Sequence, residues 1–254
     1  DLQVRPALAA VAHAVGSRLL EWREAGGSDG HWEGAQFKAK ADTLAHDALL
    51  RLLSDLDPKV PVLSEEDAAG RSGPRPERYF LIDPIDGTAS YAQGFVGFVT
   101  QIALIEAGQV RAGVVHAPAL GLTWTAELGR GAFLGETPLH CALRPDRLVL
   151  IDNYPTPRGV AATLHASLPA TGYLESGSLG LKACRVADGS ADLFVKDVTV
   201  RDWDMAPAEI ILREAGGVLT DSKGRPLDYG GTSEVDGIIA SADRRLASRA
   251  LEIL

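Results

Sequence analysis

The sequence predicts a layered protein that is α+β in its first half and α/β in its second half. Two helical repeats of apolar residues come first, and a series of apolar strands joined by short turns follows them. From about residue 145 strands and helices alternate, which is typical of an α/β unit. We therefore expect a helix pair on an antiparallel sheet over residues 1–144 and an α/β unit over residues 145–254.

The first half begins with two amphipathic helices. Apolar residues recur at helical spacing over residues 5–25, and two glycines then provide a stop signal. A second apolar stripe runs over residues 42–56, and Asp42 at its start suits a helix N-cap. Residues 28–36, between the two patterns, are polar and contain glycine, so we expect a loop there.

Strands follow the helix pair. A strand over residues 60–63 leads to Glu65 and Glu66, and adjacent side chains on an extended chain point in opposite directions, so only one should lead into a shared site. Residues 70–78 are rich in Gly, Pro and Arg and are expected to form a mobile loop. Further strands are expected over residues 79–82, 98–105, 110–116, 122–126 and 131–134.

The second half shows regular alternation. Strands are expected over residues 147–152, 171–175, 192–196 and 237–240. Helices are expected over residues 158–168, 178–188, 204–215 and 243–253. Residues 221–229 are polar and read as a hairpin or loop.

Residues 79–88 carry the strongest chemical signal. Four apolar or aromatic residues lead into Asp83, and Pro84 should end the strand because proline donates no hydrogen bond to a sheet. The turn that follows can bring the carboxylates of Asp83 and Asp86 to one point, where two neighbouring anions need a cation. Taken alone, a turn with a capping aspartate explains the pair equally well.

Composition narrows the class of protein. A formal net charge of −9 argues against a nucleic-acid-coating role, which needs a basic surface. If an acidic protein of this kind binds an anionic ligand such as a phosphate ester, bound cations must lie between the acidic side chains and the ligand. Neither Cys141 nor Cys184 has metal-ligand or redox spacing. The sequence shows no signal peptide and no apolar stretch long enough to span a membrane, so we expect a cytoplasmic protein without a membrane partner.

Three segments together resemble the inositol monophosphatase family. Residues 83–88 match its Asp-Pro-x-Asp-Gly-Thr pattern, residues 63–67 are similar to its Glu-Glu segment, and residues 202–208 resemble its Trp-Asp-x-Ala segment. The likeness extends over most of the chain. It implies a layered αβαβα fold like that of sugar phosphatases, hydrolysis of a small phosphorylated metabolite, lithium sensitivity and a homodimer.

The resemblance also implies a metal centre made of carboxylates. Hard oxygen ligands without His or Cys suit Mg²⁺, and two or three such ions are expected. The implied ligands are Glu65, Asp83 and the carbonyl of Ile85 for the first ion, and Asp83, Asp86 and Asp204 for the second. The implied catalytic residues are Glu65 and Thr88, which would orient the attacking water, and Asp42, as an outer carboxylate or third-ion ligand. A capping role at a helix start also accounts for Asp204.

Substrate contacts are implied less directly. The backbone N–H groups of Gly87 and Thr88 would hold phosphate oxygens, and Gly177 and Ser178 would line the substrate mouth. By the same resemblance Asp197 would contact substrate hydroxyls, although a loop acid serves equally well, and Arg201 is a candidate for holding a second anionic group.

Several substrates fit the resemblance. The segments around residues 201–208 and 224–229 favour 3'(2'),5'-bisphosphate nucleotides such as 3'-phosphoadenosine 5'-phosphate. Inositol 1-phosphate is the alternative, and histidinol phosphate is a third. A different class is a catalytically silent subunit that binds metal or a phosphorylated ligand, although such a protein should lack at least one of the ligand acids.

Overall fold

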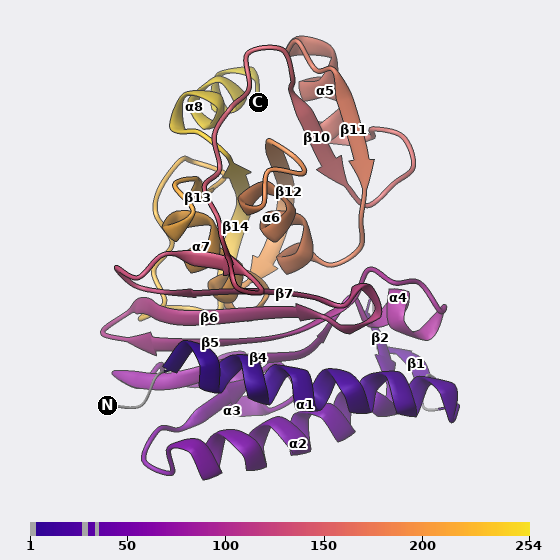
Figure 1. Cartoon of the computed structure of the whole chain (residues 1–254), viewed down its shortest axis with the longest axis vertical. Helices are drawn as coiled ribbons and strands as arrows, with labels where there is room; N and C mark the ends of the chain where they lie inside the picture. Colours follow the sequence, from indigo (N-terminus) through magenta and orange to yellow (C-terminus); the bar gives the residue numbers. More distant parts are fainter. Residues whose placement is uncertain (1–3, 27–29, 34–35) are drawn as a thin grey trace.

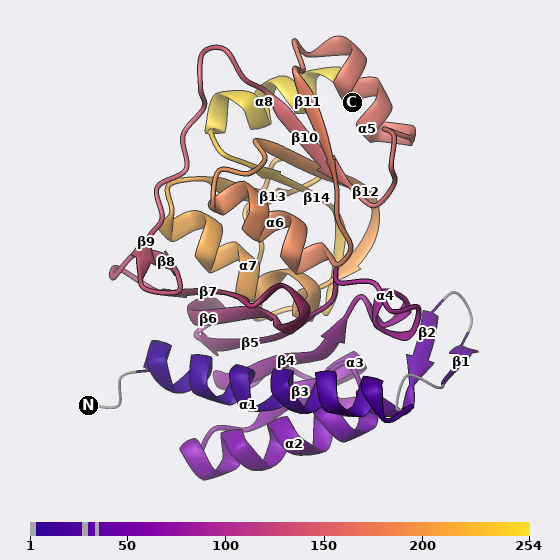
Figure 2. The same ribbon diagram turned by 45° about the vertical axis from the view of Figure 1, so that its right-hand side comes forward.

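The computed structural model describes residues 4–26, 30–33 and 36–254, and these residues form five layers (Figures 1 and 2). A helix pair covers one face of a seven-stranded sheet, and two helices separate this sheet from a five-stranded sheet. Two more helices cover the far face of the second sheet. This arrangement confirms the predicted αβαβα fold.

The first two layers contain α1 (Val4–Glu24) and α2 (Lys40–Leu56) over the seven-stranded sheet. β3 pairs with β4 in parallel, and every later neighbour in the sheet pairs antiparallel. Across the sheet the strands are β3 (Val62–Ser64), β4 (Arg78–Asp86), β5 (Val99–Glu106), β6 (Gln109–Ala117), β7 (Leu122–Glu127), β8 (Ala132–Leu134) and β9 (Thr137–Pro138).

The remaining layers belong to the second half of the chain. The inner helices are α6 (Leu179–Ala187) and α7 (Asp202–Glu214), and the outer helices are α5 (Gly159–Ser167) and α8 (Arg244–Ile253). The sheet between them has the order β11 (Gly172–Glu175), β10 (Val149–Asp152), β12 (Leu193–Arg201), β14 (Glu234–Ser241) and β13 (Val218–Asp221). β11, β10 and β12 run parallel, while β14 is antiparallel to its two neighbours.

Several local predictions were wrong. A hairpin of β1 (Gly30–Glu33) and β2 (Gln36–Ala39) lies where a loop was expected. The expected loop over residues 70–78 begins inside a short helix, α3 (Ala68–Ser72). β13 was not predicted, because its four residues show no alternation before the polar turn. None of the helices in the described part of the chain has both the length and the apolar character of a membrane span.

Three hydrophobic clusters fill the spaces between the layers. One lies between the helix pair and the seven-stranded sheet, the largest surrounds α6 and α7, and the third lies under α5 and α8. Both faces of the central strands are therefore covered, as their continuous apolar sequences require. The boundary predicted at residues 144/145 falls between β9 and β10, and a division into two domains there stays a prediction.

β4 does not end at the proline as predicted. The strand continues through Pro84 to Asp86, and its register against β5 shifts, with Asp83 opposite Gln101 and Asp86 opposite Val99. The shift is a bulge, which adds a residue to one strand and tolerates proline because a ladder bond is already lost there. A bulge also redirects side chains, and here it brings Asp83 and Asp86 to the same end of the sheet.

Gly113 of β6 allows α7 to lie close to the sheet. A Cβ atom at this position would lie 2.8 Å from Cγ2 of Ile210 and 2.8 Å from the carbonyl oxygen of Pro207. Both atoms belong to α7, which also carries Asp204. The absence of a side chain at Gly113 therefore sets how far this carboxylate stands from the sheet.

We predict that Gly113→Ala lowers the free energy of unfolding by about 1 to 3 kcal/mol, because the added methyl group overpacks the contact with α7. Urea unfolding followed by circular dichroism measures the change. Gly231→Ala is the matched control, because a Cβ there meets only Oδ2 of Asp228 at 3.8 Å. Equal stability of the two variants would contradict the prediction.

His116 of β6 is buried beneath α1. Its Nδ1 lies 2.9 Å from Oγ1 of Thr123, and a Cβ atom at Gly16 of α1 would lie 2.4 Å from its ring. Burial, followed by the charge of His13, lowers the pKa of His116 from 6.5 to about 4. The folded protein therefore holds this ring neutral over a range where the unfolded chain protonates it.

We predict that the free energy of unfolding falls as the pH is lowered from 6.5 towards 4, because His116 stays neutral in the folded protein. The unfolded chain binds a proton in this window and the folded chain does not, so the free energy of unfolding falls by at most about 3 kcal/mol. In His116→Asn, whose amide can still reach Thr123, unfolding measured across this window should depend less steeply on pH than in the wild type. Parallel pH dependences in the two proteins would show that His116 does not titrate this way.

Candidate metal centre and active site

The first carboxylate group contains Asp83, Asp86 and Asp204. Each of these residues offers an oxygen atom, and the three atoms lie within 4.8 Å of one another. Asp83 and Asp86 come from the bulged end of β4, whereas Asp204 is the third residue of α7. Oδ2 of Asp204 accepts a hydrogen bond of 2.8 Å from the backbone N–H of Arg201, which fixes its carboxylate at the helix start. The group thus joins the two halves of the chain.

The second carboxylate group contains Asp42, Glu65 and Glu66, again with oxygen atoms within 4.8 Å of one another. Asp42 is the third residue of α2, and its Oδ2 accepts a 2.7 Å hydrogen bond from the N–H of Ala39. Both glutamates lie in the turn after β3. Of the two glutamates, only Glu65 acts on the pKa of Asp83, and the expectation that one of them leads into the site shared with Asp83 stays a prediction.

Thr88 connects this second group to β4. Its hydroxyl lies 3.1 Å from Oδ1 of Asp42 and 3.0 Å from the carbonyl oxygen of Ile85, and it donates to these acceptors. Gly87, between β4 and the short helix α4 (Thr88–Ala92), has a φ of 88°, and a Cβ there would lie 3.0 Å from the carbonyl oxygen of Gly97. Glycine therefore makes the turn that places Thr88 beside Asp42.

The start of α6 contacts Asp86. Oδ2 of Asp86 accepts hydrogen bonds from the hydroxyl of Ser178 at 2.5 Å and from the N–H of Gly180 at 2.9 Å. The Ser178 hydroxyl also accepts the N–H of Leu181 and so caps the helix. Ser178 has a φ of 55°, which strains a residue with a side chain, and this conformation holds its hydroxyl against the acid.

Burial and mutual repulsion raise the pKa values of this group. Burial raises the pKa of Asp83 well above its usual range, and the charges of Glu65, Asp86 and Asp204 raise it further. Burial, followed by the charge of Asp86, raises the pKa of Asp204 to about 8. Burial also raises the pKa of Asp86, although its hydrogen bonds from Ser178 and Gly180 oppose the shift. Among the described residues, the causes that raise the pKa values of Asp83, Asp86 and Asp204 therefore outweigh those that lower them.

The donor set suits a hard divalent cation. Oδ1 of Asp83 is buried and accepts no hydrogen bond from the described residues. A carboxylate oxygen in that state costs free energy unless a cation or a proton satisfies it. The two groups supply oxygen ligands, as Mg²⁺ prefers, and neither contains His or Cys. The residues present therefore fit bound metal.

The predicted substrate residues are not all placed together. Gly177 is packed against Gly97, where a Cβ would lie 2.2 Å from the carbonyl oxygen of Gly97. Asp197 is exposed at the irregular part of β12, and it belongs to neither carboxylate group. Arg201 donates to Oε1 of Glu234 at 2.9 Å and to Oγ of Ser233 at 3.3 Å, so part of its charge is already neutralised.

Two lysines that were not predicted as site residues lie near the centre. Lys182 of α6 is 1% exposed and donates to Oδ1 of Asn153, and its charge lowers the pKa of Asp86. Lys196 of β12 donates to Oδ1 of Asp152 at 2.6 Å, with its side chain 16% exposed. After burial, the charge of Lys196 is the next cause that lowers the pKa of Lys182, to about 7. Lys182 is therefore close to both Asp86 and Lys196, and Lys196 is partly exposed.

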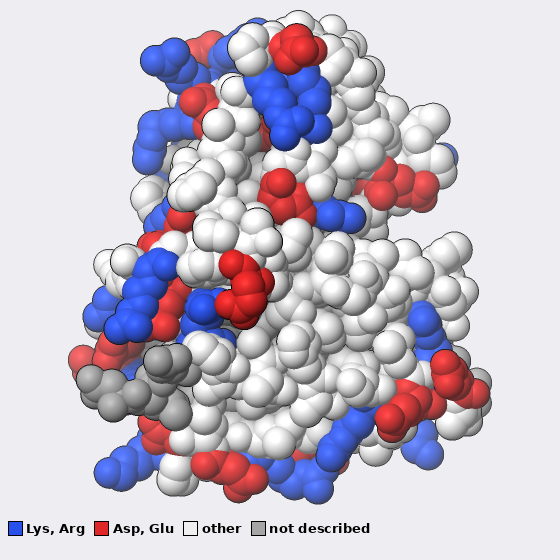
Figure 3. Space-filling view, viewed as in Figure 1, with Lys and Arg blue, Asp and Glu red and all other residues white. Residues whose placement is uncertain are grey.

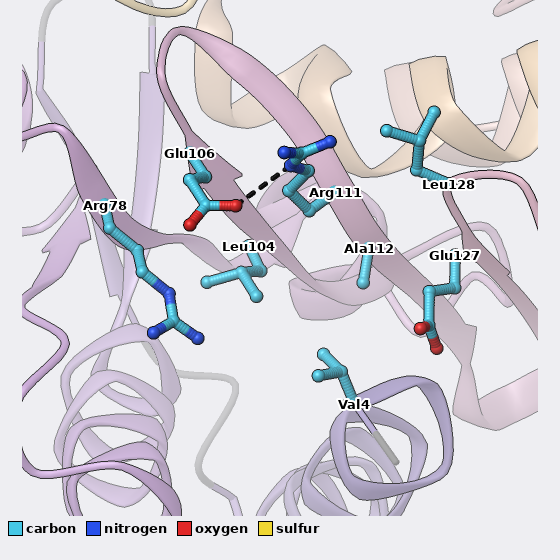
Figure 4. Close-up of a pocket in the computed structure, with 8 residues that line it drawn as sticks. All are labelled: Val4, Arg78, Leu104, Glu106, Arg111, Ala112, Glu127 and Leu128. Atoms are coloured by element: carbon cyan, nitrogen blue, oxygen red, sulfur yellow. Dashed lines mark hydrogen bonds and ion pairs between the residues drawn. The ribbon is translucent and has the colours of Figure 1, made fainter. Parts of the chain in front are cut away.

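A separate pocket lies at the opposite end of the seven-stranded sheet (Figure 4). Arg78, at the first residue of β4, lines it together with Leu104, Ala112 and the ion pair of Arg111 with Glu106. Asp83 and Asp86 lie at the other end of β4, so this pocket is no part of the centre. On the face in Figure 3 acidic and basic side chains are interspersed among large uncharged areas.

The sequence is similar to a known protein family and to several of its members. The model of the inositol monophosphatase family matches residues 3–254. The chain is 34% identical over 198 residues to the 3'(2'),5'-bisphosphate nucleotidase CysQ of Shigella flexneri, covering 74% of this chain and 78% of that protein. It is 35% identical over 161 residues to a fructose-1,6-bisphosphatase/inositol-1-monophosphatase of Thermotoga maritima, covering 59% of each.

A solved structure gives the same result for the fold. The extragenic suppressor protein suhB of Bartonella henselae superposes with a TM-score of 0.81 at 28% identity, covering 97% of both chains. The family match spans nearly the whole chain, and the two carboxylate groups fit bound metal. The chain therefore belongs to the inositol monophosphatase family and is a metal-dependent phosphatase.

Proposed function

We propose that this chain uses Mg²⁺ to hydrolyse a small phosphate monoester, and that its substrate is a 3'(2'),5'-bisphosphate nucleotide. The observation that carries the reaction class is the convergence of Asp83, Asp86 and Asp204 on one point, with Glu65 beside Asp83. The similarity to CysQ proteins supports the substrate class. Phosphate release in the presence of Mg²⁺ tests both parts.

The ligands in this proposal are Asp83, Asp86, Asp204, Glu65 and the Ile85 carbonyl. When bound there, Mg²⁺ would supply Lewis-acid chemistry, lowering the pKa of a water and neutralising charge on the phosphate. Ser178 and Gly180 hold Asp86 in place, and the N–H of Arg201 holds Asp204, so both carboxylates are oriented before a ligand enters.

The residues proposed to orient the attacking water are Glu65 and Thr88, with Asp42 as an outer carboxylate that accepts a hydrogen bond from Thr88. The Thr88 proton is directed to Asp42 and the Ile85 carbonyl, so a lone pair on its oxygen is left to accept a hydrogen bond from the attacking water. Glu65 is the neighbouring carboxylate that can take the second hydrogen. The P–O bond to the leaving oxygen breaks as the new P–O bond forms, and the leaving oxygen takes up a proton from solvent in place of the one that the attacking water loses, giving the alcohol and inorganic phosphate without a phosphoenzyme. The N–H groups of Gly87 and Thr88 are proposed to hold phosphate oxygens.

A second phosphate needs a cation beside the centre. Lys196 supplies one, because it is partly exposed and its charge reaches Lys182, whose charge in turn reaches Asp86. Asp152 balances only one of these two lysines by a direct contact. Arg201 is the alternative: its side chain is more exposed than that of Lys196 and its charge lowers the pKa of Asp204, but it has Glu234 as a partner of its own, whereas the two lysines share Asp152. We therefore assign the second anionic group of the substrate to Lys196 before Arg201.

Inositol 1-phosphate is the second candidate substrate. The 35% identity to the Thermotoga maritima protein favours it, and the exposed Asp197 could accept hydrogen bonds from hydroxyl groups. Histidinol phosphate is the third candidate substrate. Release of phosphate from the three esters side by side ranks them, and no release from any ester would favour the silent-subunit hypothesis.

We predict that Asp86→Asn reduces kcat/KM at least about 1,000-fold, equivalent to about 4 kcal/mol in the transition state, because the charge that holds the cation is lost. The amide oxygen can still accept from Ser178 and Gly180, so the fold should persist by circular dichroism. Asp47→Asn, an exposed acid on α2, is the control. Substantial residual turnover in Asp86→Asn would overturn the metal assignment.

We also predict that Lys196→Met reduces kcat/KM for 3'-phosphoadenosine 5'-phosphate about 10- to 100-fold more than for adenosine 3'-monophosphate, because one charge-assisted contact to a second phosphate is worth about 1.5 to 3 kcal/mol. Arg201→Met should affect the two substrates more equally. The reverse order of selectivity would assign the second phosphate to Arg201.

A further inference from the structure

A buried ion pair lies beside the candidate metal centre. Nε and Nη2 of Arg75 donate to Oδ2 of Asp202 at 2.9 and 2.6 Å, and the two side chains are each only 1% exposed. The third nitrogen, Nη1, donates to the carbonyl oxygen of Gly70 at 2.8 Å. Every nitrogen of this guanidinium therefore has an acceptor. The pair was not expected, because residues 70–78 were predicted to form a mobile loop.

The pair joins two segments that carry different metal-site acids. On one side, Gly70 is packed onto Ser64 so closely that a Cβ would lie 1.7 Å from the Ser64 carbonyl oxygen. Nη1 of Arg71 also donates to the carbonyl oxygen of Glu65 at 3.0 Å. The turn with the two glutamates is thus fastened to α3 and its following loop. On the other side, Asp202 begins α7, two residues before Asp204.

Ser233 provides a second connection between the segment that contains Arg71 and the start of α7. Oγ of Ser233 donates to the carbonyl oxygen of Arg71 at 3.0 Å, and the N–H of Asp202 donates to the carbonyl oxygen of Ser233 at 2.8 Å. The segment of residues 64–75 is therefore tied to the start of α7 at Arg75 and at Arg71. Of the two connections, only the Arg75 connection is a direct contact with α7.

We propose that Arg75 is a positioning residue, which holds the turn of Glu65 and Glu66 at a fixed place relative to Asp204 so that both sides of the metal centre are in place before metal binds. The inference rests on the proposed Mg²⁺ dependence. α3 is only five residues long and is followed by Gly73 and Pro74, so this segment has little regular structure of its own to hold it. Fixing it during folding removes an entropic cost from metal binding.

A positioning role predicts weaker metal binding that is separable from lost stability. Removing only the arginine leaves an unpaired buried carboxylate, which destabilises the fold in its own right. Arg75→Met/Asp202→Asn removes the charge at both positions, and the Asn oxygen can still accept the N–H of Trp203, as Oδ1 of Asp202 does at 2.9 Å. The double variant should therefore unfold at a higher temperature than Arg75→Met.

The test measures the Kd for Mg²⁺ by isothermal titration calorimetry and the thermal midpoint in chelator, for the full chain and its variants. We expect Arg75→Met and the double variant to bind Mg²⁺ about 10- to 100-fold more weakly, the range seen when outer contacts of metal ligands are lost. The Mg²⁺ concentration for half-maximal phosphate release should rise in parallel. Arg78→Met, which removes an exposed arginine from the next strand, is the matched control and should keep wild-type Mg²⁺ affinity.

Wild-type Mg²⁺ affinity in the double variant would overturn the inference, because the pair would then act on stability alone. Equal weakening in Arg78→Met would overturn it as well. If the double variant does not unfold cooperatively, Arg75→Lys decides in the same way, since lysine keeps the charge but lacks the planar fork that reaches Asp202 and Gly70 together. A wild-type chain that binds no Mg²⁺ would overturn the proposed function and this inference with it, whereas normal wild-type binding with unchanged variants would overturn the inference alone.

Discussion

Repulsion among buried carboxylates is the constraint on which the rest of the structure depends. Burial and the neighbouring charges raise the pKa of Asp83 well above its usual range and that of Asp204 to about 8. Acids in this state favour separation or protonation unless a cation enters. The fold must therefore hold them together against their own repulsion, and the free energy so stored favours metal binding.

Three helices point their starts at the acids. Asp42 and Asp204 are each the third residue of a helix, and each accepts a hydrogen bond from the N–H of the residue that precedes its helix, Ala39 or Arg201. Asp86 accepts an N–H from the first turn of α6. The start of a helix carries partial positive charge and unpaired N–H groups. The three helices therefore lower the cost of gathering the anions, and the same N–H groups orient the oxygen atoms.

Local sequence predicted the acids but not the contacts that position them. Asp83 and Asp86 stand out because they follow an apolar strand, whereas the resemblance to the family singled out Asp204 and implied the layered αβαβα fold. The bulge at Pro84 could not be predicted, because it depends on pairing with β5. Arg75 looked like part of a mobile loop, since its acceptor lies 127 residues away in the chain.

Gln101 connects the seven-stranded sheet to both helices of the middle layer. Its amide nitrogen, on β5, lies 3.1 Å from the carbonyl oxygen of Trp203, 3.3 Å from that of Asp204 and 3.5 Å from Oδ2 of Asp83. Gly180 of α6 lies so close that a Cβ there would be 2.2 Å from its Oε1. One side chain thus contacts acids from both halves and the helix that holds Asp86. Movement of α6 or α7 relative to β5 would displace the carboxylates, so the geometry of the centre depends on how these two helices pack on the seven-stranded sheet.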